Sequence, residues 1–163
     1  MSQCICFDAS IDQHCEILIL GSMPGIRSLD QQQYYAHPQN RFWRIMAEIF
    51  HHGAIPETYE DKLSLLLANK IALWDVVYSC KREGSLDSNS TNEKVQDFHS
   101  FLSTYPNIHT ICFNGNKAFT SYQRHVGMLF ADRINYCALP STSPANARWT
   151  FEKLLVEWRK ALG

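Results

Sequence analysis

The chain has 163 residues, of which 45% are hydrophobic and 19% are charged, and its formal net charge is −1. This composition is typical of one folded domain, so it excludes a chain that is disordered as a whole. The small net charge excludes a general attraction to nucleic acid, and any DNA contact must therefore be local. We expect a single domain over residues 1–163.

Residues 1–6 carry no basic segment or long apolar core, and no apolar stretch is long enough to span a bilayer. The sequence predicts a cytoplasmic protein without membrane contact. None of the six cysteines forms a C-x-x-C pair, and a group of Cys4, Cys6 and Cys15 lacks a fourth ligand at sensible spacing. We therefore expect no metal, no metal cluster and no cofactor, with Cys112 and Cys137 as buried reduced thiols.

Four short apolar runs predict buried strands, at residues 16–20, 71–77, 108–113 and 134–139. Apolar spacing predicts helices between and after them. The expected helices cover residues 42–50, opened by Pro38; 57–68; a stretch from the capping-box-like 90–93 to Leu102; and 151–162, opened by Ser143 and Pro144.

Strands that alternate with helices predict an α/β fold with a central four-stranded parallel sheet, flanked by helices on both faces. Ligands of such folds bind beyond the carboxyl ends of the strands. Residues 21–43, 114–117 and 140–146 follow the first, third and fourth predicted strands of the chain. The polar segment 79–92 follows the second predicted strand. We expect these loops to meet at one cleft.

The turn Gly21-Ser-Met-Pro-Gly25 lacks the spacing of dinucleotide-binding and P-loop motifs, and it contains no serine nucleophile elbow. It is followed by Tyr34, Tyr35, His37 and Asn40, which offer aromatic faces, a titratable ring and a neutral amide. Such a set suits a planar heterocycle such as a nucleobase. Alternatively, Asn40 only satisfies backbone donors of the turn.

Several of these segments resemble motifs of the uracil-DNA glycosylase superfamily. The resemblance lies in G-S-M-P-G at 21–25, in Y-A-H-P-Q-N-R-F-W at 35–43, and in L-P-S-T-S-P at 139–144, which is similar to the Pro-Ser loop that enters the minor groove. The segments A-L-W-D-V-V at 72–77, R-E-G-S-L-D-S at 82–88 and F-N-G-N-K-A at 113–118 resemble the branch that removes hypoxanthine from deoxyinosine.

The resemblance implies a role for Asn40. In the mismatch-specific enzymes an Asn inside the first turn positions the attacking water, but this chain has Met23 there, and a thioether cannot orient water. In the hypoxanthine branch the catalytic amide is the Asn of the H-P-x-N segment, which is Asn40. We expect Asn40 to hold the water by accepting a hydrogen bond from it.

The resemblance also implies residues that bind the base. Tyr35 would cover the extruded base, unless it is a core tyrosine, and the edge of the base would be read around the first turn and by Asn114. The full set of expected base-binding residues is Ser22, Met23, Pro24, Gly25, Tyr35 and Asn114. For Asn114 a turn-forming role stays open.

Two titratable residues are left with two roles each. Protonated His37 could meet the charge on the departing purine, or it could pack against the start of the helix. Asp75 could orient water or cap a turn, and a buried carboxylate needs a partner. We expect His37 to be catalytic together with Asn40, and Asp75 is a secondary candidate.

The Pro-Ser loop would occupy the gap left by the extruded nucleotide. The expected DNA-binding residues are Ser141, Thr142, Ser143, Pro144, Ala145, Asn146 and Lys117, with help from Arg148 and the pair at 81–82.

The resemblance thus implies a monofunctional, monomeric, metal-free DNA glycosylase that acts on DNA containing deaminated bases, most specifically deoxyinosine, in base excision repair. No lysine stands where a Schiff base would form, so strand cleavage is not expected. The alternatives are a mismatch-specific uracil or thymine glycosylase, a non-catalytic module that binds damaged DNA or a nucleobase, and an iron–sulfur glycosylase.

Overall fold

The computed structural model describes residues 3–5, 8–23, 26–77, 79–82, 85–86 and 95–163. Its centre is a parallel sheet with the strand order β3-β2-β6-β7. The strands are β2 (Ile17–Gly21), β3 (Ile71–Asp75), β6 (Thr110–Asn114) and β7 (Asn135–Leu139). All four predicted strands are confirmed, with ends that differ by one or two residues.

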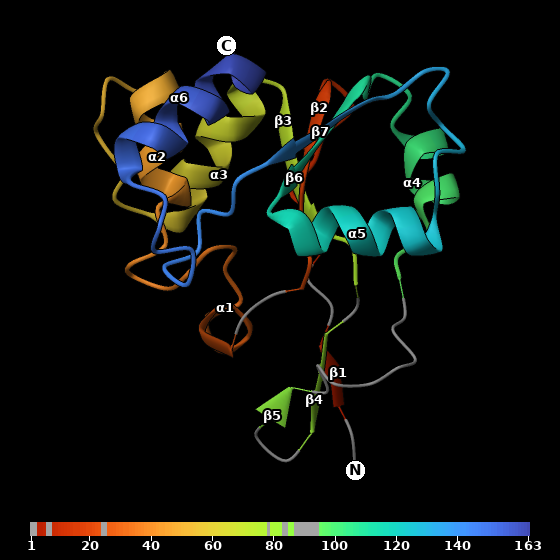
Figure 1. Ribbon diagram of the computed structural model, residues 1–163, viewed down its shortest axis with the longest axis horizontal. Coiled ribbons are helices and arrows are strands. Elements are labelled where there is room, and N and C mark those ends of the chain that lie inside the picture. The colour runs from red at the N-terminus through yellow and green to blue at the C-terminus, as the bar shows by residue number, and fades with distance from the viewer. Residues whose placement is uncertain (1–2, 6–7, 24–25, 78, 83–84, 87–94) are drawn as a thin grey trace.

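Helices cover both faces of this sheet (Figure 1). One face carries α2 (Phe42–Phe50), α3 (Tyr59–Ala68) and α6 (Phe151–Leu162), and the other carries α4 (Phe98–Thr104) and α5 (Asn116–His125). Along β2, Ile19 packs in the core of the first face, whereas Leu18 and Leu20 pack in the core of the second. Alternate residues of one strand therefore pack in two hydrophobic cores, one on each face of the sheet. This confirms the predicted fold class.

The start of α2 differs from the prediction. The helix begins at Phe42, while Pro38 lies in a turn before it. Asn40 stands two residues before the helix, and its Oδ1 accepts the backbone N–H of Phe42 at 2.9 Å. The prediction that Pro38 opens the helix was wrong, because a side-chain acceptor at Asn40 takes the place of a first helical turn.

The start of α6 also differs. Thr150 caps the helix by accepting the N–H of Lys153, so the prediction of an opening at Ser143 and Pro144 was wrong. Those residues belong to a loop that its own hydrogen bonds hold, as in the bond from Asn146 Nδ2 to the carbonyl of Ser141 at 2.9 Å.

Helix α4 begins at Phe98, after Asp97 caps it by accepting the N–H of Ser100. Val95, which was predicted to be helical, forms an antiparallel bridge with Val77 instead. The predicted capping box at 90–93 lies outside the described residues.

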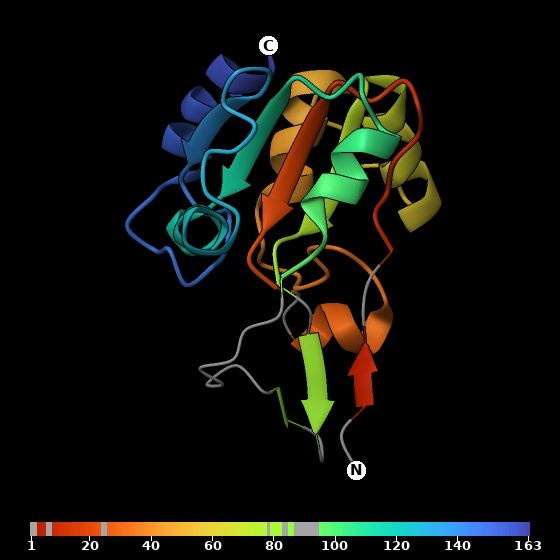
Figure 2. The same ribbon diagram turned by 90° about the vertical axis from the view of Figure 1, so that its right-hand side faces the viewer.

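Several elements were not predicted: α5, the short helix α1 (Ile26–Gln31), and a small antiparallel sheet of β1 (Gln3–Ile5), β4 (Ser79–Arg82) and β5 (Ser85–Leu86). Helix α1 and the small sheet lie beyond the carboxyl ends of the parallel strands (Figures 1 and 2). The buried pair Ala118 and Tyr122, one helical turn apart, is the signal by which α5 could have been found.

None of the helices in the described part of the chain has the length and apolar character needed to cross a bilayer. Cys15 and Cys112 are buried free thiols and Cys137 is partly exposed. The prediction of a buried reduced thiol is confirmed for Cys112, where burial raises the pKa to about 12.

Candidate active site

The carboxyl ends of three neighbouring strands bring three residues to one level. Gly21 of β2 pairs with Asp75 of β3, and the pairing of Leu20 with Phe113 places Asn114 of β6 beside Gly21. A cavity of ≈ 620 Å³ opens at this level. A cavity therefore lies at the carboxyl ends of the strands, where the sequence predicted the ligand to bind.

Most of the predicted site residues line this cavity. They are Ser22, Met23, Tyr35, His37, Asn40, Asn114, Ser141, Thr142, Ser143 and Pro144. Pro24 and Gly25 lie outside the described residues. Ala145 and Asn146 line a second cavity, and Lys117 is exposed in the first turn of α5.

Thr142 joins the two amides of the site. Its backbone N–H donates to Asn114 Oδ1 at 3.0 Å, and its Oγ1 accepts from Asn114 Nδ2 at 3.0 Å. The same hydroxyl donates to Asn40 Oδ1 at 2.8 Å. The Thr142 side chain is 0% exposed. Thr142 is therefore buried, whereas the predicted contact residues that follow it are at least partly exposed.

Arg41 holds the loop that contains Thr142, a role that the sequence did not reveal. Its guanidinium donates to the carbonyls of Thr142 at 3.4 Å, Ser143 at 2.8 Å and Asn146 at 3.1 Å, and also to the carbonyl of Trp149. The planar fork of donors suits several carbonyls at once. Asn40 and Arg41 thus fix the cavity wall from adjacent positions.

Tyr35 has one aromatic face covered by the protein. Its ring stacks on Phe42, with centroids 4.1 Å apart and an interplanar angle of 24°. Its backbone is left-handed, with φ of 56°, which is uncommon for a tyrosine. A base could therefore stack only on the opposite face.

Tyr34 is a core residue rather than a second platform. It is 4% exposed, its carbonyl accepts from Trp43 Nε1 at 3.0 Å, and its hydroxyl donates to the carbonyl of Asp8 at 3.2 Å. These contacts explain its place in the motif by packing alone.

Asp75 is a buried carboxyl in the cavity wall. It is 5% exposed, and within the described residues its Oδ2 has no hydrogen-bond partner. Burial raises the pKa of Asp75 to about 7. A Cβ at Gly21 would lie 2.6 Å from Asp75 Oδ1, so a larger residue at this position would have to displace the Asp75 carboxyl group.

His37 is tied to the turn before α2. Its Nδ1 accepts the backbone N–H of Gln39 at 3.0 Å, and its carbonyl accepts the N–H of Asn40. Both bonds stay within the turn and hold His37 there. These contacts support the packing role of His37.

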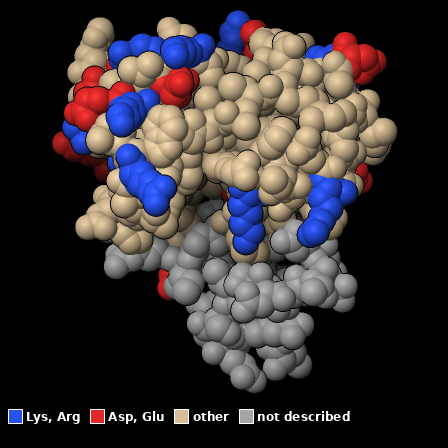
Figure 3. Space-filling view, viewed as in Figure 1, with Lys and Arg blue, Asp and Glu red and all other residues tan. Residues whose placement is uncertain are grey.

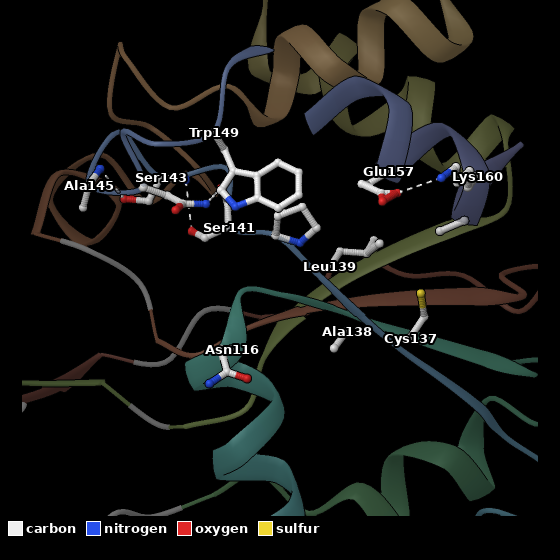
Figure 4. A pocket seen from close by; sticks show the side chains of 13 residues that line it. Asn116, Cys137, Ala138, Leu139, Ser141, Ser143, Ala145, Trp149, Glu157 and Lys160 are labelled. Atoms are coloured by element: carbon white, nitrogen blue, oxygen red, sulfur yellow. Dashed lines mark hydrogen bonds and ion pairs between the residues drawn. The ribbon is translucent and has the colours of Figure 1, made fainter. Parts of the chain in front are cut away.

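A second cavity, of ≈ 950 Å³, lies on the other side of the same loop, between β7, α6 and the start of α5 (Figure 4). Trp149 and Asn116 stand on its two sides, and the ion pair of Lys160 with Glu157, at 3.2 Å, lies at one end. Ser141 and Ser143 line both cavities. The loop is therefore a thin wall between two hollows.

Charged side chains of both signs lie on the face shown in Figure 3. Acidic and basic side chains lie together at the upper left, over the side of α2, α3 and α6, and Lys and Arg side chains also project from the lower edge near α5. Helix α5 carries Lys117 and Arg124. A phosphate chain that approached the cavity would meet cations on this edge, despite the net charge of −1.

No group of three or more His, Cys, Asp or Glu side chains in the described part of the chain could hold a metal ion. The side chains that line the cavity offer amides, hydroxyl groups, an imidazole, a buried carboxyl and aromatic rings.

Comparison with known proteins gives a consistent result. The family model of the uracil DNA glycosylase superfamily matches residues 9–163. A protein of Methanosarcina acetivorans named hypoxanthine DNA glycosylase is 40% identical over 144 residues, which is 88% of this chain and 89% of the relative. One of Methanosarcina barkeri with the same name is 41% identical over 112 residues, covering 69% and 71% of the two chains.

A solution NMR structure from Methanosarcina acetivorans, assigned in name to the uracil DNA glycosylases, superposes with a TM-score of 0.80. It is 37% identical and covers 99% of this chain and 97% of its own.

Proposed function

The chain belongs to the uracil DNA glycosylase superfamily, and we propose that it is a monofunctional DNA glycosylase that hydrolyses the N-glycosidic bond of deoxyinosine and releases hypoxanthine. Two relatives of about 40% identity carry the name hypoxanthine DNA glycosylase, which supports this substrate. Met23 lines the cavity where mismatch-specific enzymes would need an amide. The proposed substrate of the protein is DNA that contains a deaminated base. We expect the protein to act as a cytoplasmic monomer.

The observation that carries the proposal is the position of Asn40. Its amide lies in the wall of the cavity and is held there by the N–H of Phe42 and the hydroxyl of Thr142. An amide fixed before substrate binds can position a water molecule without reorganisation during the reaction.

In the reaction, the C1′–N9 bond breaks, its electron pair leaves with the purine, and positive charge develops on the sugar. Water adds its oxygen to C1′, and the departing base takes up a proton, so the products are an abasic sugar and neutral hypoxanthine. Asn40 positions the water, and the face of Tyr35 opposite Phe42 covers the extruded base. Backbone groups at Ser22 and Met23 and the side chain of Asn114 border the edge of the base.

The DNA strand would meet the loop after Thr142. Ser143, Pro144 and Ala145 follow the buried threonine and are at least partly exposed, so they can enter the gap left by the extruded nucleotide. Lys117 would contact a phosphate as a point charge.

The test uses a duplex oligonucleotide with one deoxyinosine, under single-turnover conditions. Wild-type protein should release free hypoxanthine and leave a site that breaks only after alkali. Asn40→Ala should lose about 10²- to 10³-fold in rate, as for the loss of one preorganised polar group, while duplex binding persists. Asn69→Ala is the matched control, because Asn69 caps α3 at the opposite edge of the sheet.

A parallel assay with uracil tests the second candidate substrate, which the name of the structural neighbour favours. If the protein releases uracil faster than hypoxanthine, uracil is the preferred base and the proposal of hypoxanthine is wrong. Tight binding of either duplex without any base release would show a binding module and overturn the enzyme proposal.

A further inference from the structure

The three polar side chains at the cavity wall form one directional chain of hydrogen bonds. Thr142 N–H can only donate, and its partner at 3.0 Å is Asn114 Oδ1. This contact orients the Asn114 amide, so that Nδ2 faces Thr142 Oγ1 and donates to it at 3.0 Å. One end of the chain is therefore fixed by the backbone.

The direction continues through the hydroxyl. Because Thr142 Oγ1 receives a hydrogen from Asn114, its own hydrogen is available for Asn40, which lies 2.8 Å away. The backbone N–H of Phe42 also points at the Asn40 carboxamide, at 2.9 Å, and can only donate. Two donors thus meet at the same atom, and that atom must be the carbonyl oxygen Oδ1.

Both lone pairs of Asn40 Oδ1 are then in use. What the carboxamide offers to a further partner is its Nδ2–H group, since Oδ1 and Nδ2 point in different directions from one carbon. We propose that Thr142 is a positioning residue, which holds Asn40 so that Asn40 acts in the cavity as a hydrogen-bond donor. This inference rests on the proposed function, and it reverses the expectation that Asn40 accepts a hydrogen bond from the attacking water.

The donor role has a chemical consequence. A water that accepts a hydrogen bond from Asn40 Nδ2–H keeps a second lone pair for C1′, but it gains no base to remove its proton. Such weak activation suffices for glycosidic bonds that break through a sugar cation, because the cation needs little nucleophilic push. Asn40 then acts by placing the water. After attack, the surplus proton of that water is taken up by the departing purine, which leaves as neutral hypoxanthine.

The hydroxyl of Thr142 is tested by Thr142→Val and Thr142→Ser in the full chain. Valine keeps the volume and removes the hydroxyl, which leaves Asn40 and Asn114 each short of a partner, at about 1 to 3 kcal/mol. Expressed as a ratio of rates, this energy is about 5- to 150-fold, and we expect the single-turnover rate on deoxyinosine to fall by this factor in T142V. The dissociation constant for the duplex should change little.

Rescue by the conservative variant separates positioning from packing. T142S restores the hydroxyl without the methyl group and should work at close to the wild-type rate. Thr104→Val is the matched control, because the Thr104 hydroxyl donates to the carbonyl of Ser100 within α4 and does not line the cavity. A T142V enzyme as fast as wild type, or a T142S enzyme as slow as T142V, would overturn the positioning role.

The polarity of Asn40 is tested by Asn40→Asp. One carboxylate oxygen can still accept from Phe42 and Thr142, but the other presents an acceptor to the cavity instead of a donor. We expect N40D to be as impaired as N40A. An N40D enzyme that clearly exceeds N40A would show that an acceptor serves the reaction and would overturn the donor role.

A measurement on the free protein keeps this inference separate from the proposed function. In ¹⁵N-labelled protein, the side-chain amide signals of Asn40, assigned by their loss in N40D, should shift in T142V and remain near their wild-type positions in T142S. Signals that stay unchanged in T142V would refute the hydrogen-bond chain even if deoxyinosine is the substrate. Absence of hypoxanthine release by wild type, with the shifts as expected, would refute only the proposed function.

Discussion

Single polar atoms in the cavity wall carry unequal energetic costs. The amides of Asn40 and Asn114 are anchored through Thr142, whereas Oδ2 of the buried Asp75 has no partner among the described residues. The site therefore combines a satisfied network with a carboxyl that is costly to ionise. That cost makes the stability of the fold depend on pH.

The sign of this dependence follows from the raised pKa. Burial raises the pKa of Asp75 from 3.8 to about 7, so between these values the folded chain binds more protons than the unfolded chain. The contribution of Asp75 to the unfolding free energy is most favourable below about pH 4, falls as the pH rises to about 7, and is constant above.

Asp75→Asn should remove the loss of unfolding free energy that Asp75 causes as the pH rises. Relative to wild type, the unfolding free energy of the variant should be higher by on the order of a few kcal/mol at pH 8, and this difference should shrink towards pH 4. Melting curves across this pH range measure it, with the exposed Asp132→Asn as control. A difference between variant and wild type that does not vary with pH would contradict the assignment.

The loop between β7 and α6 illustrates how an element without regular structure is held in place. Arg41 donates to four of its carbonyl groups, and Ser141 and Ser143 bond to backbone groups within the loop. Buried or half-buried carbonyls of a loop need such donors, because no strand or helix supplies them. The guanidinium thus substitutes for secondary structure.

Arg41→Lys should loosen this loop, since one ammonium group cannot replace a planar fork that contacts four carbonyls. We expect faster amide hydrogen exchange over residues 142–149 and a loss of about 10-fold or more in glycosylase rate, equal to about 1.4 kcal/mol. Arg159→Ala, which removes one exposed contact to the carbonyl of Glu48, is the control. Unchanged exchange in the loop would show that Arg41 is dispensable for its order.

At the scale of the whole molecule, binding to DNA depends on where the charges lie. The net charge is −1, and α5, whose first residue Asn116 lines the second cavity, carries Lys117 in its first turn and Arg124 in its last turn. Few phosphates are neutralised by such a surface, so affinity should decline moderately with salt.

Log affinity for DNA falls as log salt concentration rises, and Lys117→Ala should make this slope shallower by about 1. The rate of base release on bound DNA should stay unchanged. Titrations of a labelled duplex at several salt concentrations measure this slope. Lys70→Ala is the control, because Lys70 pairs with Glu16 at the opposite edge of the sheet. Equal slopes for both variants would remove Lys117 from the DNA interface.

The sequence by itself determined the sheet, its two covered faces and the edge at which the site lies. Apolar runs and helical spacing are local patterns, and they depend only on neighbours within a few residues. The loops that hold Asn40 and Asn114 were placed at this edge in the same way, whereas the roles expected for the two amides came from the resemblance to the uracil-DNA glycosylase superfamily.

Only the tertiary structure decided which way the Asn40 amide faces and how the loop after β7 is held. Those features depend on bonds such as the one from Thr142 to Asn40, between residues 102 positions apart, and on the contacts of Arg41 with residues 101 to 108 positions away. A hydrogen bond between distant residues leaves no periodic trace in the chain. The direction in which a site presents its donors and acceptors therefore emerges only after folding brings them together.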